Sequence, residues 1–154
     1  MRITDKELQK MFDKAGVSKE RLHSALIKMG KKNLKTKLMR DKWSEENPTT
    51  NYCYVIAEFV FCFFAPDGTI PYKLKGIPGD DGLHRFLRWP DGTVVDLAVD
   101  QFPNYEDVNY ELGRKCYFMY PSPSKRARLL AELYGVKLPK ETDDTIIEIL
   151  GDRE

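Results

Sequence analysis

Residues 52–65, YCYVIAEFVFCFFA, restrict the possible folds most, because this run is almost wholly apolar. It is too short for a membrane-spanning helix, which needs about 18 apolar residues, so it predicts a buried element at the centre of a globular domain. Periodicity alone does not separate a buried helix from a buried strand. The length favours a helix, whereas the β-branched and aromatic residues favour a strand. We expect a helix.

A β-hairpin is predicted over residues 83–99. The two runs LHRFLRW and TVVDLAV are rich in strand-forming residues, and the tripeptide PDG at 90–92 supplies a turn between them. The preceding segment TIPYKLKGI, residues 69–77, is predicted as another strand, and GIPGDDG, residues 76–82, as a loop. An antiparallel sheet is therefore expected beside the buried helix.

Two helices are predicted at the start of the chain. Thr4 and Glu7 form a capping box, and Gly16 suits a left-handed helix end. Ser18 opens the second helix and Gly30 ends it. The apolar residues of each helix fall on one face at helical spacing: Leu8, Met11, Phe12 and Ala15 on the first, and Leu22, Ala25, Leu26 and Met29 on the second.

A third, strongly basic helix is predicted over residues 33–43, with Leu34, Leu38 and Met39 facing inward and Trp43 at its end. A loop must follow, because a residue before proline avoids helical geometry and Asn47 precedes a proline.

The second half of the chain is expected to be less regular. Residues 100–121 are polar and aromatic without a clear period, and are predicted as a long ordered loop. A helix over residues 125–134 begins after Pro123 and Ser124, and Gly135 ends it. The tail at 145–150, TIIEIL, fits a short helix or an added strand, and we expect a helix.

The chain of 154 residues is expected to form a single α+β domain. Its net charge of +1 conceals an asymmetry, since residues 1–42 carry a charge of +8 and the remainder −7. We divide the domain into a basic helical head (1–42), a core (43–130) and a C-terminal extension (131–154). Such a charge distribution indicates either an acidic partner or two faces that attract each other, and the second is commoner.

Seven basic residues crowd the segment 28–42, which makes nucleic acid a possible partner. The segment lacks the interleaved aromatic residues that stack on bases, so a solvated lysine face is the simpler interpretation. The residues in question are Lys28, Lys31, Lys32, Lys35, Lys37, Arg40 and Lys42.

The cysteines and the first residues indicate a cytoplasmic protein. Cys53, Cys62 and Cys116 make an odd number, which fits reduced thiols better than a disulfide framework. The start of the sequence lacks the apolar middle of a signal peptide, and no spanning segment is present. No cysteine or histidine spacing suggests zinc, so we expect neither a metal nor a cofactor.

Cys53 is the candidate nucleophile. It stands at the start of the predicted apolar helix, where the helix dipole and the first amide groups favour the thiolate. The same amides could hold the oxyanion formed by attack on a carbonyl group. Cys62, inside the apolar run, is interpreted as structural, and Cys116 could be either.

His84 and Asp96 are the candidate partners of this thiol. Counted across the predicted hairpin turn they are nearly opposed, and opposed residues of antiparallel strands lie about 5 Å apart. Asp96 would orient the imidazole of His84, whose other nitrogen would take the proton of Cys53. The alternative is a cross-strand pair with no thiol nearby. His23 is interpreted as structural.

Four blocks of the sequence together resemble the YunG-like family of small bacterial and phage proteins, which has a papain-like or transglutaminase-like fold. They are NPTTNYC, the apolar helix, LHRFLRWPDGTVVDLAVDQF and the Pro-Ser-Lys-Arg segment at 123–126. The resemblance covers about residues 43–130. Asn51 replaces a glycine of the family pattern, which is tolerable because asparagine enters the left-handed region readily. Arg85-Phe86 and Ala98 also depart from that pattern.

The resemblance implies that Cys53 is the nucleophile, His84 the general base and Asp96 the orienting acid. It also implies an oxyanion-hole role for Asn47, whose spacing from the cysteine is that of papain-like enzymes, and a place near the site for Gln101. The expected function is cysteine-dependent hydrolysis or acyl transfer on an amide or ester, including those of proteins. The alternative is a non-catalytic papain-like binding module whose basic head holds nucleic acid or a host protein.

Overall fold

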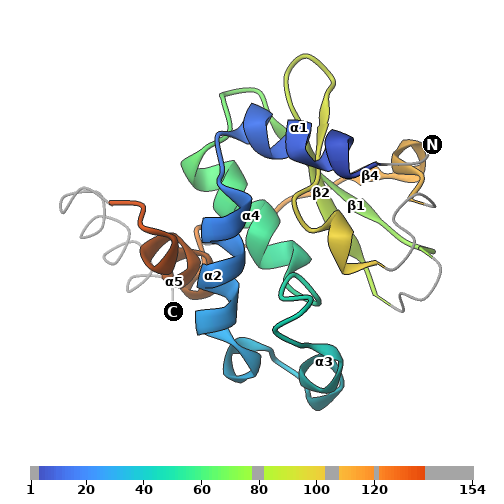
Figure 1. Ribbon diagram of the computed structural model, residues 1–154. Helices are drawn as coiled ribbons and strands as arrows, with labels where there is room; N and C mark the ends of the chain where they lie inside the picture. Colours follow the sequence, from blue (N-terminus) through green and yellow to red (C-terminus); the bar gives the residue numbers. More distant parts are fainter. Residues whose placement is uncertain (1–3, 78–81, 103–107, 120–121, 138–154) are drawn as a thin grey trace.

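The computed structural model describes residues 4–77, 82–102, 108–119 and 122–137. Within them the chain is an α+β protein, with helices packed around a four-stranded antiparallel sheet (Figure 1). The expected fold class is confirmed at this level. None of the helices in these ranges has the length and apolar character needed to cross a membrane.

The first two helices form as predicted. Helix α1 spans Asp5–Ala15 and helix α2 spans Lys19–Met29. The hydroxyl oxygens of Thr4 and Ser18 accept hydrogen bonds from the amides three residues on, and Gly16 adopts a left-handed conformation with φ of 72°. All eight predicted inward-facing residues of the two helices are buried.

The predicted basic helix over 33–43 is wrong in its extent and in its inner face. The structure has a 3-10 turn, η1 (Lys31–Asn33), followed by the short helix α3 (Lys37–Lys42). Leu34 is buried, but Leu38 is 62% exposed and Met39 36% exposed. Leu34 precedes α3, so the helical spacing that would have placed Leu38 on the same inner face is interrupted between the two leucines.

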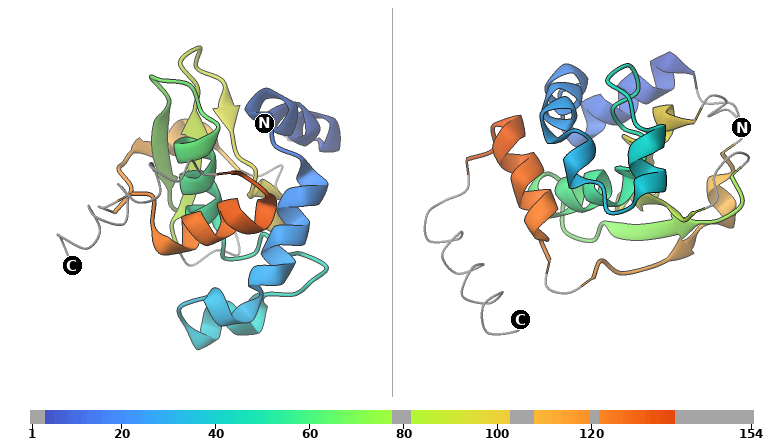
Figure 2. Two further views of the ribbon diagram at one scale, coloured as in Figure 1. Left: turned by 90° about the vertical axis from the view of Figure 1, so that its left-hand side faces the viewer. Right: turned by 90° about the horizontal axis from the view of Figure 1, so that it is seen from below.

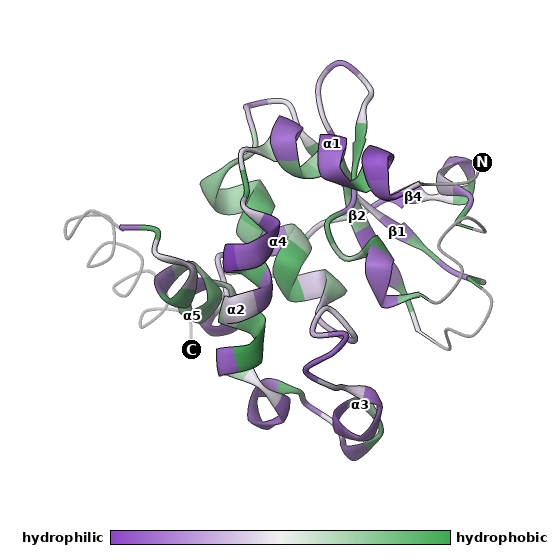
Figure 3. Ribbon diagram, viewed as in Figure 1, coloured by the Kyte–Doolittle hydropathy of each residue, from purple (hydrophilic) through white to green (hydrophobic). Residues whose placement is uncertain are grey.

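Helix α4 (Cys53–Phe63) confirms the helix expected in the apolar run. It contacts strand β2 on one side and helix α5 on another, which explains why a helix so apolar is stable here. Figure 2 shows α4 between the sheet and α5, and Figure 3 shows it mostly green among more polar surface elements.

The sheet has the strand order β3-β2-β1-β4. Strands β1 (Ile70–Leu74) and β2 (His84–Arg88) form its centre, and β3 (Val94–Val95) completes the predicted hairpin. Strand β4 (Arg114–Lys115) pairs with β1 and was not predicted.

The interpretation of residues 100–121 as one loop is therefore wrong in part. This region contains β4 and the 3-10 turn η4 (Tyr110–Leu112), and it overlaps η2 (Val99–Gln101). A strand of two residues is too short to show a sequence pattern. Strand β4 is held by its pairing with β1 rather than by its own composition.

Helix α5 (Lys125–Tyr134) has the predicted start and end, with Ser124 as cap and Gly135 in a left-handed conformation. It packs on α4 and α2, so residues on both sides of the boundary drawn at 130/131 belong to the core. The predicted helix at 145–150 lies outside the described residues.

Candidate functional site

The loop NPTTNYC sets Cys53 as the first residue of α4. Its backbone turns at Asn51, which has φ of 63°, the left-handed conformation anticipated for this position. Tyr52 is fully buried, and its hydroxyl donates to the carbonyl of Gly30. Cys53 is partly exposed, and its Sγ lies 3.7 Å from the carbonyl oxygen of Leu83. The thiol is thus held beside the start of β2.

His84 and Asp96 form the buried centre of the site. Nε2 of His84 lies 2.6 Å from Oδ2 of Asp96, with the side chains 0% and 1% exposed. The predicted pair is confirmed, but the predicted reason for it is wrong. Leu87 pairs with Val95, so the ladder is shifted by two residues and Asp96 lies beyond the end of β3. A shift of two keeps both side chains on one face of the sheet.

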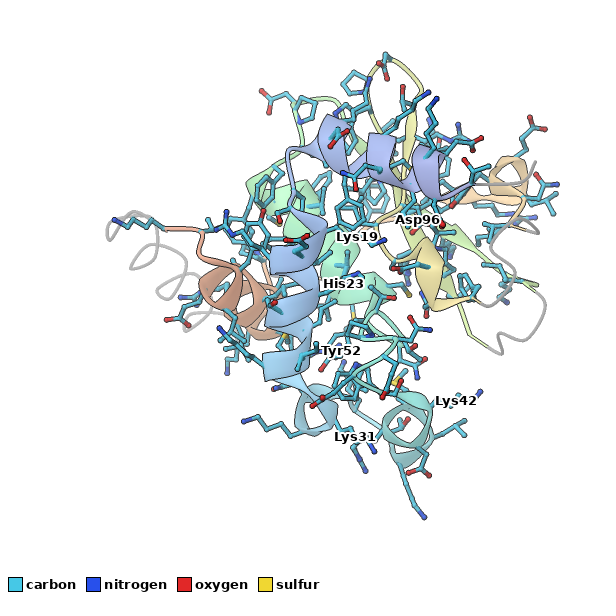
Figure 4. The ribbon with its side chains drawn as sticks, viewed as in Figure 1. Lys19, His23, Lys31, Lys42, Tyr52 and Asp96 are labelled. Carbon is cyan, nitrogen blue, oxygen red and sulfur yellow. The ribbon has the colours of Figure 1, made fainter. Side chains whose placement is uncertain are left out.

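Asp96 is fixed by groups from three other parts of the chain. The hydroxyl of Tyr110 donates to Oδ2 at 2.8 Å, and the amide of Ala98 donates to Oδ1 at 3.2 Å. Its own amide lies 3.3 Å from the sulfur of Met11 on α1. Figure 4 shows Asp96 between α1 and η2. The carboxylate is therefore held in one orientation toward the imidazole.

The electrostatics of this centre favour a charged imidazole. Burial alone would lower the pKa of His84, but the charge and hydrogen bond of Asp96 raise it above its usual value, and Cys53 adds to that rise. Burial, together with Asp96, raises the pKa of Tyr110 far above its usual value, so its hydroxyl remains a donor.

The two imidazole nitrogens face different partners. Because Nε2 faces Asp96, Nδ1 is the nitrogen left for Cys53, whose thiol contributes to the raised pKa of His84. Cys53, His84 and Asp96 are thus brought together in the order in which a cysteine triad transfers a proton.

Gln101 links the thiol-bearing loop to the imidazole. Its Oε1 accepts from the amide of Asn51 at 3.2 Å, and its Nε2 lies 3.4 Å from Nδ1 of His84. The same Nε2 donates to the carbonyl of Ala98. The expectation that Gln101 sits near the site agrees with this geometry.

Asn47 supports the site from one step further away. Its Nδ2 donates to the backbone carbonyl of Gln101 at 3.2 Å, and its Oδ1 lies 3.3 Å from Oγ1 of Thr49. One amide hydrogen of Asn47 is thus committed to holding η2. The side-chain amide closest to the imidazole is that of Gln101.

Sequence reasoning missed one contributor to the site, Tyr110. Tyr110 lies in a segment with no periodic pattern, so nothing in the sequence links it to Asp96. His23, interpreted as structural, points from α2 toward η2 (Figure 4), with Nε2 3.4 Å from Oδ2 of Asp100. Asp100 also accepts from the hydroxyl of Thr49 at 2.7 Å. Helix α2 thus lies beside η2.

The other thiols have different surroundings. Cys62 lies 3.5 Å from the hydroxyl of Ser122, and burial raises the pKa of its thiol. Cys116 is buried and accepts from Nη1 of Arg85 at 3.2 Å. Across the described ranges, no three His, Cys, Asp or Glu residues are grouped so as to hold a metal ion.

No protein-family model, curated protein or solved structure matches the chain significantly.

Proposed function

We propose that this protein is a cysteine-dependent enzyme that attacks an amide or ester through Cys53. The observation that carries the proposal is the alignment of a thiol at a helix start with a buried imidazole and a buried carboxylate. A His-Asp pair with a purely structural role does not require a thiol near Nδ1 of the histidine. Perturbed titratable groups that meet in this way are typical of catalytic sites.

In the resting pair the proton of Cys53 lies on Nδ1 of His84, so the first step begins with a thiolate beside an imidazolium. Sγ then forms a bond to the substrate carbonyl carbon as the carbonyl π bond opens. The carbonyl oxygen takes up the negative charge. The first amides of a helix have no carbonyl acceptors within the helix, so those of α4 can donate to this oxygen. The hydrogen bond from Nε2 to Asp96 stabilises the imidazolium meanwhile.

In the second step Nδ1 returns its proton to the leaving amine or alcohol as the bond from the carbonyl carbon breaks. This leaves a thioester on Cys53. Water, or an acceptor amine, then attacks the thioester and gives its proton to Nδ1. The bond from the carbonyl carbon to Sγ breaks, and the thiolate and imidazolium are restored. Water gives a peptidase or amidase, and an amine gives a transglutaminase-type product. No metal or cofactor takes part in this scheme.

The proposal extends to the finer fold. A helix that begins at the nucleophile and packs on an antiparallel sheet bearing the histidine is the arrangement of papain-like enzymes. Here α4 contacts β2, and His84 is the first residue of β2. These features, with the resemblance to the YunG-like family, support a papain-like assignment.

The direct test is the rate of iodoacetamide labelling at each cysteine from pH 5 to 9, followed by peptide mass spectrometry. At pH 6 we expect Cys53 to react faster than Cys62 and Cys116, and we expect His84→Ala to remove this difference. Cys62 serves as an internal control, since burial raises the pKa of its thiol. If Cys53 reacts no faster than Cys62 at pH 6, the proposed chemistry is wrong.

A second test examines acyl transfer itself. Incubation with p-nitrophenyl acetate should release p-nitrophenolate and leave an acetyl group on Cys53, detectable by mass spectrometry. Cys53→Ser should abolish the acetylated peptide while leaving the melting temperature within a few degrees of wild type.

One observation favours a second candidate, a binding module. Exposed lysines surround the exposed Leu38 and Met39 at the end of the molecule formed by η1 and α3, where Figure 4 labels Lys31 and Lys42. Such a surface would suit an acidic partner, either nucleic acid or protein. This role requires no reactive thiol, so the labelling experiment separates it from catalysis.

A further inference from the structure

A row of cations crosses three neighbouring strands of the sheet. Lys73 of β1 stands opposite Arg85 of β2 on one side and opposite Arg114 of β4 on the other. Like charges directly opposed across strands are destabilising. The described residues place no carboxylate within ion-pair distance of Lys73 or Arg114. Among the described residues this row therefore presents a positive field to a ligand.

Two members of this row open onto a cleft. The cleft has a volume of about 400 Å³ and is lined by Lys73, Lys75, Leu83, Leu112 and Arg114. All three cations are exposed to solvent. Leu83 and Leu112 supply the apolar part of the wall, so the cleft suits a small group with an anionic end.

The cleft adjoins the candidate nucleophile through Leu83. The side chain of Leu83 lines the cleft, while its carbonyl oxygen lies 3.7 Å from Sγ of Cys53. Lys73 is the direct strand partner of Arg85, whose guanidinium lies 5.1 Å from the ring centroid of Tyr54. An anionic group in the cleft would thus lie close to an acyl group attacked by Cys53.

Arg85, the third member of the row of cations, lies on the side of α4. Its guanidinium lies 5.1 Å from the ring centroid of Tyr54, the residue after Cys53. That position is fixed further by the hydrogen bond to Cys116. Arg85 is therefore held by Tyr54 and Cys116, whereas no side-chain hydrogen bond or ion pair joins Lys73, Lys75 or Arg114 to another described residue.

We propose that the cleft of Lys73, Lys75 and Arg114 binds a carboxylate of the substrate, so that Cys53 acts on acyl groups with an acidic neighbour. This inference rests on the proposed function of Cys53. The connection between β1 and β2 also carries Asp80 and Asp81, which lie outside the described residues. The experiment therefore measures the charge preference of the reaction at Cys53 directly, so that any effect of Asp80 and Asp81 is included in the result.

The test compares two alkylating agents of nearly equal size, iodoacetate and iodoacetamide. In both reactions the thiolate forms a bond to the methylene carbon and iodide leaves, but only iodoacetate carries a carboxylate. The measured quantity is the rate constant of Cys53 with iodoacetate divided by its rate constant with iodoacetamide, at pH 7 and low ionic strength. It reports the charge preference independently of the thiol's general reactivity.

The triple variant Lys73→Gln/Lys75→Gln/Arg114→Gln should lower this ratio roughly tenfold or more, since each nearby charge contributes several-fold in the Coulomb energy at a protein surface. The matched control Lys31→Gln/Lys35→Gln/Lys37→Gln removes the same charge at η1 and α3, and should change the ratio less than about twofold. Lys75 lies outside the paired residues of β1, so Lys75→Gln alone should leave the sheet intact and lower the ratio roughly threefold. This single variant keeps the test valid if the triple variant misfolds.

The outcomes separate this inference from the function on which it rests. A ratio that falls in the cleft variants but not in the control supports it, as does a ratio that falls from 20 to 500 mM salt, ionic strengths chosen to span strong and weak screening. If Cys53 reacts rapidly with iodoacetamide but the ratio ignores the cleft variants, the inference is overturned and the catalytic thiol stands. If Cys53 is unreactive toward both agents, both fall.

Discussion

Asp96 reaches His84 diagonally rather than from directly across the hairpin. In the observed register Asp96 would stand opposite Phe86, yet its Oδ2 lies 2.6 Å from Nε2 of His84. The chain leaves β3 after Val95 and enters η2, and this bend carries the carboxylate toward the start of β2. The same bend brings Gln101 to the other imidazole nitrogen.

Asp96→Asn should slow the labelling of Cys53 by iodoacetamide at pH 6 at least about tenfold, because an amide stabilises the imidazolium less well and can favour the wrong tautomer. Asp91→Asn is the matched control. Asp91 pairs with Lys14 on the surface and has no contact with the site. Equal labelling of Cys53 in both variants would show that Asp96 does not act on the imidazole.

The raised pKa of His84 makes a specific prediction for stability. A base whose pKa is higher in the folded state binds a proton more tightly there, so its contribution is complete below the unfolded value near 6.5 and is lost as the pH rises toward the folded value, about 10. The difference in free energy of unfolding between wild type and His84→Gln should therefore shrink from pH 6 to 9. We expect a change of at least about 1.4 kcal/mol, equal to one pKa unit.

Urea unfolding at both pH values measures this difference. Using the difference from the variant cancels the contributions of tyrosines and other groups that titrate in the same window. A difference that grows with pH would mean that His84 is neutral in the folded protein, and a constant difference would mean that its proton is not linked to folding.

The helices that could be predicted from the sequence are those with local signals at both ends. Thr4, Ser18 and Ser124 cap their helices by bonds to amides three residues on, and such bonds require no knowledge of the rest of the chain. The exposure of Leu38 and the existence of β4 could not be predicted in the same way. Leu38 is 62% exposed although its spacing predicted an inward position, and β4 forms by pairing with β1.

The site shows the same division. The pairing of His84 with Asp96 could be predicted from residue types and approximate spacing. A register error of two residues did no harm, because such a shift keeps both side chains on the same face of the sheet. Tyr110 could not be found, since its contact with Asp96 at 2.8 Å joins segments without any shared pattern.

Asn51 should be replaceable by glycine but not by valine. Its φ of 63° is costly for most residues by roughly 1–2 kcal/mol and more for β-branched ones, and the turn sets the start of α4 at Cys53. Asn51→Gly should keep the labelling rate of Cys53 within about threefold, although it loses the bond from Nδ2 to the carbonyl of Met39. Asn51→Val should lower both the rate and the melting temperature. Equal behaviour of the two variants would show that the turn does not position the thiol.

Glu58 is predicted to stabilise the fold without acting in the site. Its buried carboxylate accepts from the hydroxyl of Ser122 at 2.6 Å and from the amide and hydroxyl of Ser124, which begins α5. Glu58→Ala should cost about 3 kcal/mol in free energy of unfolding, because three partly buried hydrogen bonds to a buried carboxylate are lost. The exposed Glu132→Ala should cost less than about 0.5 kcal/mol. A loss below 1 kcal/mol for Glu58→Ala would show that water replaces the carboxylate.

The binding-module alternative predicts a different response to salt. If the exposed lysines of the basic head hold nucleic acid, binding should release counterions and weaken steeply as salt rises, with a slope of about 0.9 per phosphate contacted on duplex DNA. Fluorescence anisotropy with a labelled 20-base-pair duplex and a single-stranded RNA of similar length measures this between 20 and 200 mM salt, a range in which phosphate contacts are strongly screened. Lys31→Glu/Lys35→Glu/Lys37→Glu should abolish such binding, whereas Lys10→Glu/Lys14→Glu on α1 should alter it little. Absence of binding to both probes at 20 mM salt excludes the nucleic-acid version, and binding that resists 200 mM salt excludes an electrostatic origin in these lysines.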